Sequence, residues 1–387
     1  MRMVWPFTVN VLLFASGACV FPFFVLYYQS LGFTGTQIGL ITGLTPLITL
    51  VSAPLWTNLA DATRRHRLLM SVLILAAALV VSAFPFFRTF GPVLVIAVIY
   101  AAAGAPVISF ADNATMATLG DEKALYGRVR LGGTFGFGVA ALLVGFLVEG
   151  YGIRMAFWMG GALQLLALLA SQPLTHRAIK SAEVKAGRVT DLFADRRWLP
   201  FLMLAFAAGL GFAVSNTYLF PYMEELGAST FTMGLALTLA TVAEVPVFFF
   251  GNRLIERFRP FSLLLLAMLL SGARLVFFVF ATTPEFVLFL QFLNGLTFPV
   301  LWLAGVAYAD EHAPPGMGAT AQGMFSATVF GFGAAIGGLT AGLLLEYVGG
   351  RGMFLSFGVT VLAIVAVVAL FHRQLSGRVE QRVAGSV

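Results

Sequence analysis

The stretch Leu174–Arg197, LTHRAIKSAEVKAGRVTDLFADRR, decides how the chain is organised, because it is the one long polar segment among 387 residues. It carries six lysines and arginines against three acidic residues, and it separates two apolar halves of nearly equal length. We therefore predict four parts: an N-terminal bundle over 1–173, a linker over 174–197, a C-terminal bundle over 198–372 and a polar tail over 373–387.

The composition of the chain requires lipid as its solvent. Hydrophobic residues make up 59% of the chain and charged residues 10%, and the mean hydropathy is +0.93. A water-soluble domain carries about 25% charged residues. The isoelectric point near 9.7 comes from bases in short loops between apolar runs, a pattern typical of membrane orientation signals, so we expect no nucleic-acid partner. The single cysteine, Cys19, excludes an internal disulfide.

Twelve apolar runs are long enough to cross a bilayer, which takes about 20 residues. Six precede the linker and six follow it, which predicts an all-α membrane protein with twelve transmembrane helices in two pseudo-symmetric six-helix bundles. The predicted spans are 4–28, 36–58, 68–87, 92–118, 125–148, 154–173, 198–222, 231–252, 261–281, 285–309, 318–345 and 352–372.

The positive charges predict the orientation of these spans. If both termini are cytoplasmic, most bases fall in cytoplasmic connections. Outside the linker and the termini these bases are Arg64, Arg65, Arg67, Lys123, Arg128, Arg253, Arg257 and Arg259. The external connections hold only Arg88, Arg154 and Arg351. We expect a monomer in the inner membrane of a bacterium, with the bilayer as its surroundings and both termini in the cytoplasm.

The two halves repeat each other at an offset of about 195 residues, which is typical of a duplicated bundle. The motif FGFG occurs at 135–138 and again at 330–333. Further matched residues are Glu149, Tyr151, Gly152, Arg154 and Phe157 with Glu346, Tyr347, Gly349, Arg351 and Phe354. Two such halves joined by a loop predict a site between them.

Short motifs then point to a family. Residues 21–24 read FPFF, residues 126–130 read YGRVR and residues 244–246 read EVP. The loop from Pro54 to Arg65 keeps the acid and the bases of the signature G-x-x-x-D-(R/K)-x-G-(R/K)-(R/K), with Thr57 and Thr63 in place of glycines. Together these motifs resemble the major facilitator superfamily, and within it the branch of galactoside, phenylpropionate and nucleoside symporters. The likeness covers nearly the whole chain and implies alternating access without a cofactor.

Four ionisable side chains fall deep within the predicted spans, where each costs several kcal/mol unless it is paired or hydrated. Asp112 and Arg130 lie about two turns from the same end of adjacent spans, so they can form an ion pair. Glu244 and Arg274 both fall near the midplane and are predicted to pair across the C-terminal bundle. For each pair the alternative is a structural lock between helices.

The resemblance implies roles for these residues. Asp112 and Arg130 match an acid and an arginine that bind substrate hydroxyls. Glu244 matches an acid that contacts substrate, and Arg274 matches an arginine involved in proton release. Asn113 is a further candidate for substrate binding, because it lies beside Asp112.

Three further positions depart from the family pattern. Asn294 and Thr297 stand where a histidine and a proton-carrying glutamate are expected, and neither titrates near neutral pH. Any proton coupling must therefore use Asp112 or Glu244, while Asn294 remains a candidate for substrate contact. Phe137 replaces a tryptophan that stacks on sugar rings, so it offers an apolar face without a donor.

At the cytoplasmic end, Asp61, Arg64 and Arg65 are predicted to latch an inner gate, with Asp310 as the matching acid of the second half. A solvated helix end is the alternative for Asp310. The four histidines show no metal-ligand spacing, so we expect no metal. Neither a Walker-type glycine loop nor a nucleophile triad can be assembled, which argues against an ATPase and an enzyme.

The sequence thus predicts a secondary active transporter, with proton-coupled symport of a small polar or amphipathic solute as the favoured function. Sugars, nucleosides and aromatic acids are the candidate substrates. One alternative is export or flipping of amphipathic compounds or lipids, suggested by the many phenylalanines. Another is a membrane receptor or scaffold that transports nothing.

Overall fold

The computed structural model describes residues 3–122, 125–175, 192 and 195–384, so most of the predicted linker and Lys123 lie outside the described residues. The N-terminal half contains α1 (Val4–Val20), α2 (Phe23–Ser30), α3 (Gly35–Thr63), α4 (His66–Ala83), the short 3₁₀ helix η1 (Phe84–Phe86), α5 (Phe90–Gly104), α6 (Val107–Leu119), α7 (Tyr126–Tyr151) and α8 (Arg154–Ser171). The C-terminal half contains α10 (Trp198–Thr217), α11 (Leu219–Glu225), α12 (Thr230–Arg257), α13 (Pro260–Phe278), α14 (Pro284–Gln291), α15 (Asn294–Glu311), α16 (Gly318–Ser326), the π-helical turn η3 (Ala327–Gly333) and α17 (Ala334–Ala384). The described residues form no β strand.

Several spans consist of two consecutive helices, and a proline lies at three of the breaks. Pro22 lies between α1 and α2, and Pro106 lies between α5 and α6. Pro221 follows the break between α10 and α11 and stands four residues after Thr217. A proline has no N–H to donate, and its ring clashes with the carbonyl four residues earlier. The breaks bend the spans without ending them.

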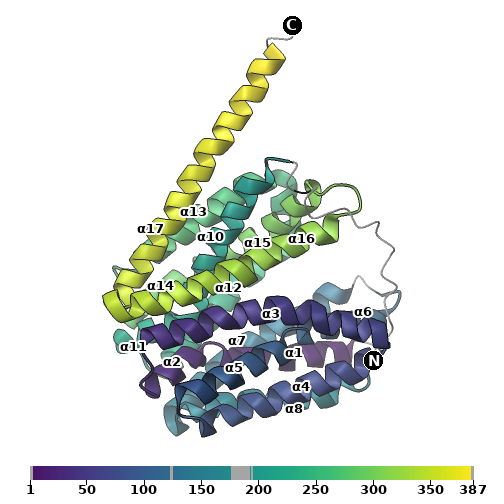
Figure 1. Cartoon of the computed structure of the whole chain (residues 1–387), viewed down its shortest axis with the longest axis vertical. Helices are drawn as coiled ribbons and strands as arrows, with labels where there is room; N and C mark the ends of the chain where they lie inside the picture. The colour runs from purple at the N-terminus through teal and green to yellow at the C-terminus, as the bar shows by residue number, and fades with distance from the viewer. Residues whose placement is uncertain (1–2, 123–124, 176–191, 193–194, 385–387) are drawn as a thin grey trace.

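Eleven stretches of the described chain are long and apolar enough to cross a membrane. The last of these, Gly318–Phe371, contains two predicted spans, because Gly349 (φ 70°, ψ 178°) interrupts the helical backbone of α17. Gly152, its repeat partner, ends α7 with φ 89° and ψ 164°. Glycine adopts such positive φ values without strain. The prediction of twelve spans in two six-helix bundles is confirmed, and α17 turns sharply before it projects beyond the bundles (Figure 1).

The two halves pack against each other along α3 with α17 and along α7 with α12. Glycines allow both contacts. A Cβ atom on Gly342 of α17 would lie 2.5 Å from the Cα of Gly39 on α3, and one on Gly145 of α7 would lie 2.6 Å from the carbonyl oxygen of Thr230 on α12. Small residues let membrane helices approach closely enough for extensive van der Waals contact. Figure 1 shows α3 beside the first part of α17 at the boundary between the bundles.

Each half also places one glutamate at the start of a helix of the other half. Glu346 accepts hydrogen bonds from the backbone N–H of Thr36 (2.7 Å) and from its hydroxyl (2.9 Å), in the first turn of α3. Its repeat partner Glu149 accepts from the N–H of Phe231 (3.0 Å), in the first turn of α12. First-turn N–H groups have no partner within their own helix, and a carboxylate is favoured there by the helix dipole. The pseudo-symmetry therefore produces two equivalent caps.

These contacts lie at one end of the molecule, here called the closed end, which carries residues 31–34, 152–153, 226–229 and 349. At the opposite end, here called the linker end, the halves part. The face of α3 that contacts the C-terminal half runs from Gly35 through Leu50, which meets Gly331. Helical spacing continues this face to Pro54, Asn58 and Asp61, and these three residues are exposed.

We predict that Glu149→Gln together with Glu346→Gln opens the closed end. Glutamine keeps the shape of each cap but loses its charge, which costs about 1 kcal/mol per cap. Each lost charge should lower the ratio of closed to open molecules about fivefold. Spin labels attached through Tyr151→Cys and Tyr347→Cys, both exposed at the closed end, report the distance between the halves. The distance distribution should gain a longer component.

The matched control is Glu224→Gln, a change of an exposed acid at the same end that caps no helix of the other half in the described structure. Cys19 is fully buried and should take up no label. An unchanged distance distribution in the double variant would contradict the role of the two caps.

Candidate functional site

An acid and an arginine meet on the N-terminal half. Asp112 lies on α6 and Arg130 on α7, and their Oδ1 and Nη1 atoms are 3.4 Å apart. The same Nη1 atom is 3.4 Å from Oδ1 of Asn10 on α1, and the guanidinium lies 4.5 Å from the centre of the Phe14 ring. The Asp112 side chain is 28% exposed and that of Arg130 39%. These contacts are longer than the 2.7–2.9 Å of a tight ionic hydrogen bond, so both groups keep capacity for another partner.

Two more predicted residues lie on the same two helices. Phe137 follows Arg130 by seven residues on α7, and two helical turns place both on the same face. Its ring is partly buried. Asn113 follows Asp112 on α6 and is exposed. The roles of all four in substrate binding stay predictions.

On the C-terminal half, an asparagine links the acid to the arginine. Arg274 Nη1 donates to Asn294 Oδ1 at 2.7 Å, and Asn294 Nδ2 donates to Glu244 Oε1 at 2.6 Å. The prediction of a direct pair between Glu244 and Arg274 is therefore wrong. Because α15 packs against both α12 and α13, the side-chain amide of Asn294 on α15 can accept from Arg274 and donate to Glu244.

The dipeptide Asn294–Gly295 explains how this bridge forms. A Cβ atom on Gly295 would lie 2.8 Å from the carbonyl carbon of Ala243, so only a glycine lets α15 approach the α12 backbone this closely. Asn294 directly precedes Gly295, and Glu244 directly follows Ala243. The sequence singled out Asn294 as a replacement of a family residue and missed its bridging geometry, although the adjacent glycine was a usable signal.

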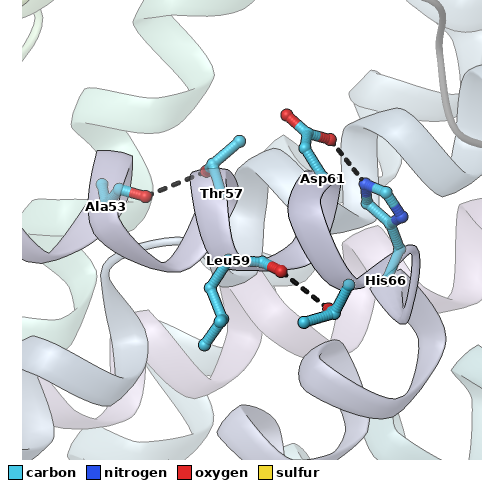
Figure 2. Close-up of polar contacts among 6 residues, drawn as sticks. Ala53, Thr57, Leu59, Asp61 and His66 are labelled. Carbon is cyan, nitrogen blue, oxygen red and sulfur yellow. Dashed lines mark hydrogen bonds and ion pairs between the residues drawn. The ribbon is translucent and has the colours of Figure 1, made fainter.

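At the linker end, Asp61 pairs with a histidine that the sequence pattern did not single out. Oδ1 of Asp61 and Nε2 of His66 are 2.8 Å apart, and Figure 2 shows the two side chains facing each other across the turn. Arg64 lies in that turn with φ 55°, the one positive φ among the described non-glycine residues. Thr57 and Thr63, which replace the glycines of the signature, donate to the carbonyls four residues earlier, at 2.9 and 2.7 Å. Such bonds satisfy a hydroxyl within a helix.

The other predicted gate residues are present but do not join the halves. Arg64 and Arg65 are exposed and line an open pocket together with Arg67 and Gln172. Asp310 is exposed near the end of α15. No ion pair connects the two halves among the residues that the structure describes. This agrees with the parting of the halves at the linker end, and the latch itself stays a prediction.

The geometry defines the class of protein. Two helical bundles meet at one end and part at the other, and each holds an ionisable cluster near the level at which they part. The hydroxyl of Thr238 on α12 still donates to the carbonyl of Gly138 on α7 at 2.8 Å, and Glu244 lies six residues further toward the linker end. Within the described residues, no group of three or more metal-binding side chains occurs. The chain is an integral membrane transporter and not an enzyme.

Comparison with known proteins gives the family. The family described as "MFS_1 like family" matches residues 8–356, and the chain belongs to this family of major facilitator transporters. The chain is 30% identical over 386 residues to the maltose permease of Geobacillus stearothermophilus, covering 96% of this chain and 95% of the relative. It is 25% identical over 391 residues to a putative nucleoside transporter of Escherichia coli (strain K12), covering 93% and 91%.

A solved structure supports the same fold. The crystal structure of a mutant of the nucleoside transporter NupG superimposes with a TM-score of 0.87, covering 96% of this chain and 99% of that one, at 16% identity. At this level of identity the likeness concerns the fold alone.

We predict that Asn294→Ala destabilises the protein. The substitution leaves one buried N–H of Arg274 and one oxygen of Glu244 without their present partner, and an unsatisfied buried polar group costs about 1–3 kcal/mol. The melting temperature in lipid nanodiscs should fall clearly below that of Asn58→Ala, which changes an exposed asparagine of α3. Equal melting temperatures for the two variants would argue that the bridge contributes nothing.

Proposed function

We propose that this transporter is a proton-coupled symporter that takes up a hydroxylated small solute, a sugar or a nucleoside, as a monomer in a bacterial inner membrane. The observation that carries the proposal is the pair of ionisable clusters on opposite halves. Asp112–Arg130 and Glu244–Asn294–Arg274 lie near the level where the halves part. A solute between the halves can contact both clusters, and alternating access needs a site of this kind.

The distribution of bases supports an orientation with both termini in the cytoplasm. The linker end carries Arg64, Arg65 and Arg67, and the polar linker adds six more bases. Short cytoplasmic loops are enriched in lysine and arginine. In this orientation the closed end faces outward, so the structure corresponds to an inward-open state that Glu149 and Glu346 close on the outside.

The substrate class rests on the chemistry of the N-terminal cluster and on the relatives. A carboxylate accepts hydrogen bonds from hydroxyls and a guanidinium donates to them, and Asp112 and Arg130 are both accessible. Phe137 supplies an apolar face to a ring. The relatives named above include a maltose permease and a putative nucleoside transporter.

The coupling proton is assigned to a carboxylate of these clusters, and Glu244 is favoured over Asp112. The amide of Asn294 separates Glu244 from the charge of Arg274, whereas Asp112 meets Arg130 directly. An amide has both a donor and an acceptor. Asn294 Nδ2 can therefore keep donating to the carbonyl oxygen of Glu244 after this side chain is protonated, and Asn294 Oδ1 keeps accepting from Arg274 at the same time.

Transport in proteoliposomes tests this proposal. Wild-type protein should accumulate labelled maltose or uridine when the outside is acidic. Glu244→Gln should keep exchange of the same solute at equal pH and lose accumulation against the gradient, because exchange needs no net proton movement. Asp112→Asn should lose both, because it removes a substrate ligand.

Two outcomes would contradict the proposal. If Asp112→Asn and Glu244→Gln each kept full gradient-driven accumulation, no carboxylate of the two clusters would carry the proton. If wild-type protein moved neither solute, the substrate class would be wrong.

A further inference from the structure

A basic pocket opens at the linker end of the N-terminal half, between the start of α4 and the residue that follows α8. Its cavity of about 560 Å³ is lined by the run RRHR at 64–67 and by Leu68, Ser71 and Gln172. We name it the Arg67 pocket. Figure 1 shows α4 and α8 side by side at the edge of the N-terminal half farthest from the C-terminal half, so this pocket is separate from the solute site between the halves.

The arginines of the Arg67 pocket have hydrogen-bonding capacity that the protein leaves unused. Among the described residues, Arg64 and Arg65 make no side-chain hydrogen bond and no ion pair. Arg67 makes one long contact, 3.4 Å from its Nη2 to Oε1 of Gln172. No carboxylate belongs to the described lining. A guanidinium carries five N–H donors and no acceptor, so three of them together favour an anion with several oxygen atoms.

Two further features of the Arg67 pocket suit such an anion. Gln172 Nε2 donates to the Ser71 hydroxyl at 3.1 Å, which fixes the amide so that its oxygen faces Arg67. Helix α4 begins at His66, and no side chain caps its first N–H groups. These N–H groups have no partner within their own helix and carry the positive end of the helix dipole. They add backbone donors to the charge of the arginines.

Two apolar stripes lead away from the Arg67 pocket along the helices that form it. On α4 the exposed apolar side chains recur at helical spacing and start at the pocket itself: Leu68, Val72, Leu75 and Leu79. On α8 the face that ends near Gln172 carries the exposed side chains of Trp158, Leu165 and Leu169. In a membrane protein such surfaces contact acyl chains. A positively charged pocket at the end of two apolar stripes matches a phospholipid, which has a phosphate group at one end and hydrocarbon at the other.

We propose that the Arg67 pocket binds the phosphate group of an anionic membrane lipid. The guanidinium groups of Arg64, Arg65 and Arg67 hold the phosphate oxygens, and the acyl chains lie along the exposed leucines of α4 and α8. Basic pockets between membrane helices bind the head groups of anionic lipids in this way. A free phosphate shares the head-group chemistry but would leave both apolar stripes uncovered, so the stripes favour a lipid.

Native mass spectrometry of the full-length protein, stripped of lipid and then titrated, tests this site. The probes are dioleoyl phosphatidylglycerol, dioleoyl phosphatidylcholine and inorganic phosphate. Wild-type protein should bind its first phosphatidylglycerol more tightly than phosphatidylcholine, whose choline offsets the charge of the phosphate. In the double variant Arg65→Gln with Arg67→Gln, the first phosphatidylglycerol should bind about 25-fold more weakly, because each arginine contributes about fivefold.

The matched control is the double variant Arg257→Gln with Arg259→Gln. It removes the same charge from two exposed arginines at the same end, in the connection between α12 and α13, and neither residue lines the Arg67 pocket. This variant should bind the first phosphatidylglycerol like wild type. All four arginines are exposed, so both double variants are expected to fold, and equal melting temperatures check this.

Three results would overturn the proposal. If Arg65→Gln with Arg67→Gln binds the first phosphatidylglycerol like wild type, the pocket holds no lipid. If the control variant loses as much affinity, the effect is a general attraction by positive charge. If inorganic phosphate displaces phosphatidylglycerol at equal concentration, the occupant is a soluble phosphate and the assignment to a lipid is wrong.

Discussion

The structure depends on one constraint, the cost of several kcal/mol for an ionised side chain inside a bilayer. The chain meets this cost four times, and the two halves of the protein solve it in different ways. Asp112 and Arg130 form a loose pair that stays accessible, whereas Glu244 and Arg274 share the amide of Asn294. A bundle that only had to pack would need none of these charges, so their presence on both halves separates a transporter from a scaffold.

The closed end shows how two halves without a hydrophobic driving force between them stay together. Lipid tails are as apolar as the helices, so association depends on close packing and on hydrogen bonds. Gly39 and Gly342 provide the packing, and Glu149 and Glu346 provide the bonds at the starts of α12 and α3. Both contacts lie toward the closed end, whereas the halves part at the linker end.

Much of the fold followed from the sequence because lipid imposes strong rules. The twelve spans follow from hydropathy, and the turns at Gly152 and Gly349 follow from the repeat. The site followed only in part. Sequence spacing brought Asp112 and Arg130 to the same depth, but it cannot show that α15 lies between α12 and α13, and so it missed the bridge through Asn294. The pairing of Asp61 with His66 depends on the turn at Arg64, which spacing does not reveal.

Alternating access requires the halves to move as units about the two clusters, and distances measured at both ends of the protein test this movement. Spin labels at Tyr151→Cys and Tyr347→Cys report the closed end, and labels at Ala62→Cys and Glu311→Cys, both exposed, report the linker end. On addition of maltose or uridine, alternating access predicts opposite changes: the distance at the linker end shortens while the distance at the closed end lengthens. Changes of the same sign at both ends, or a change at one end alone, would contradict it.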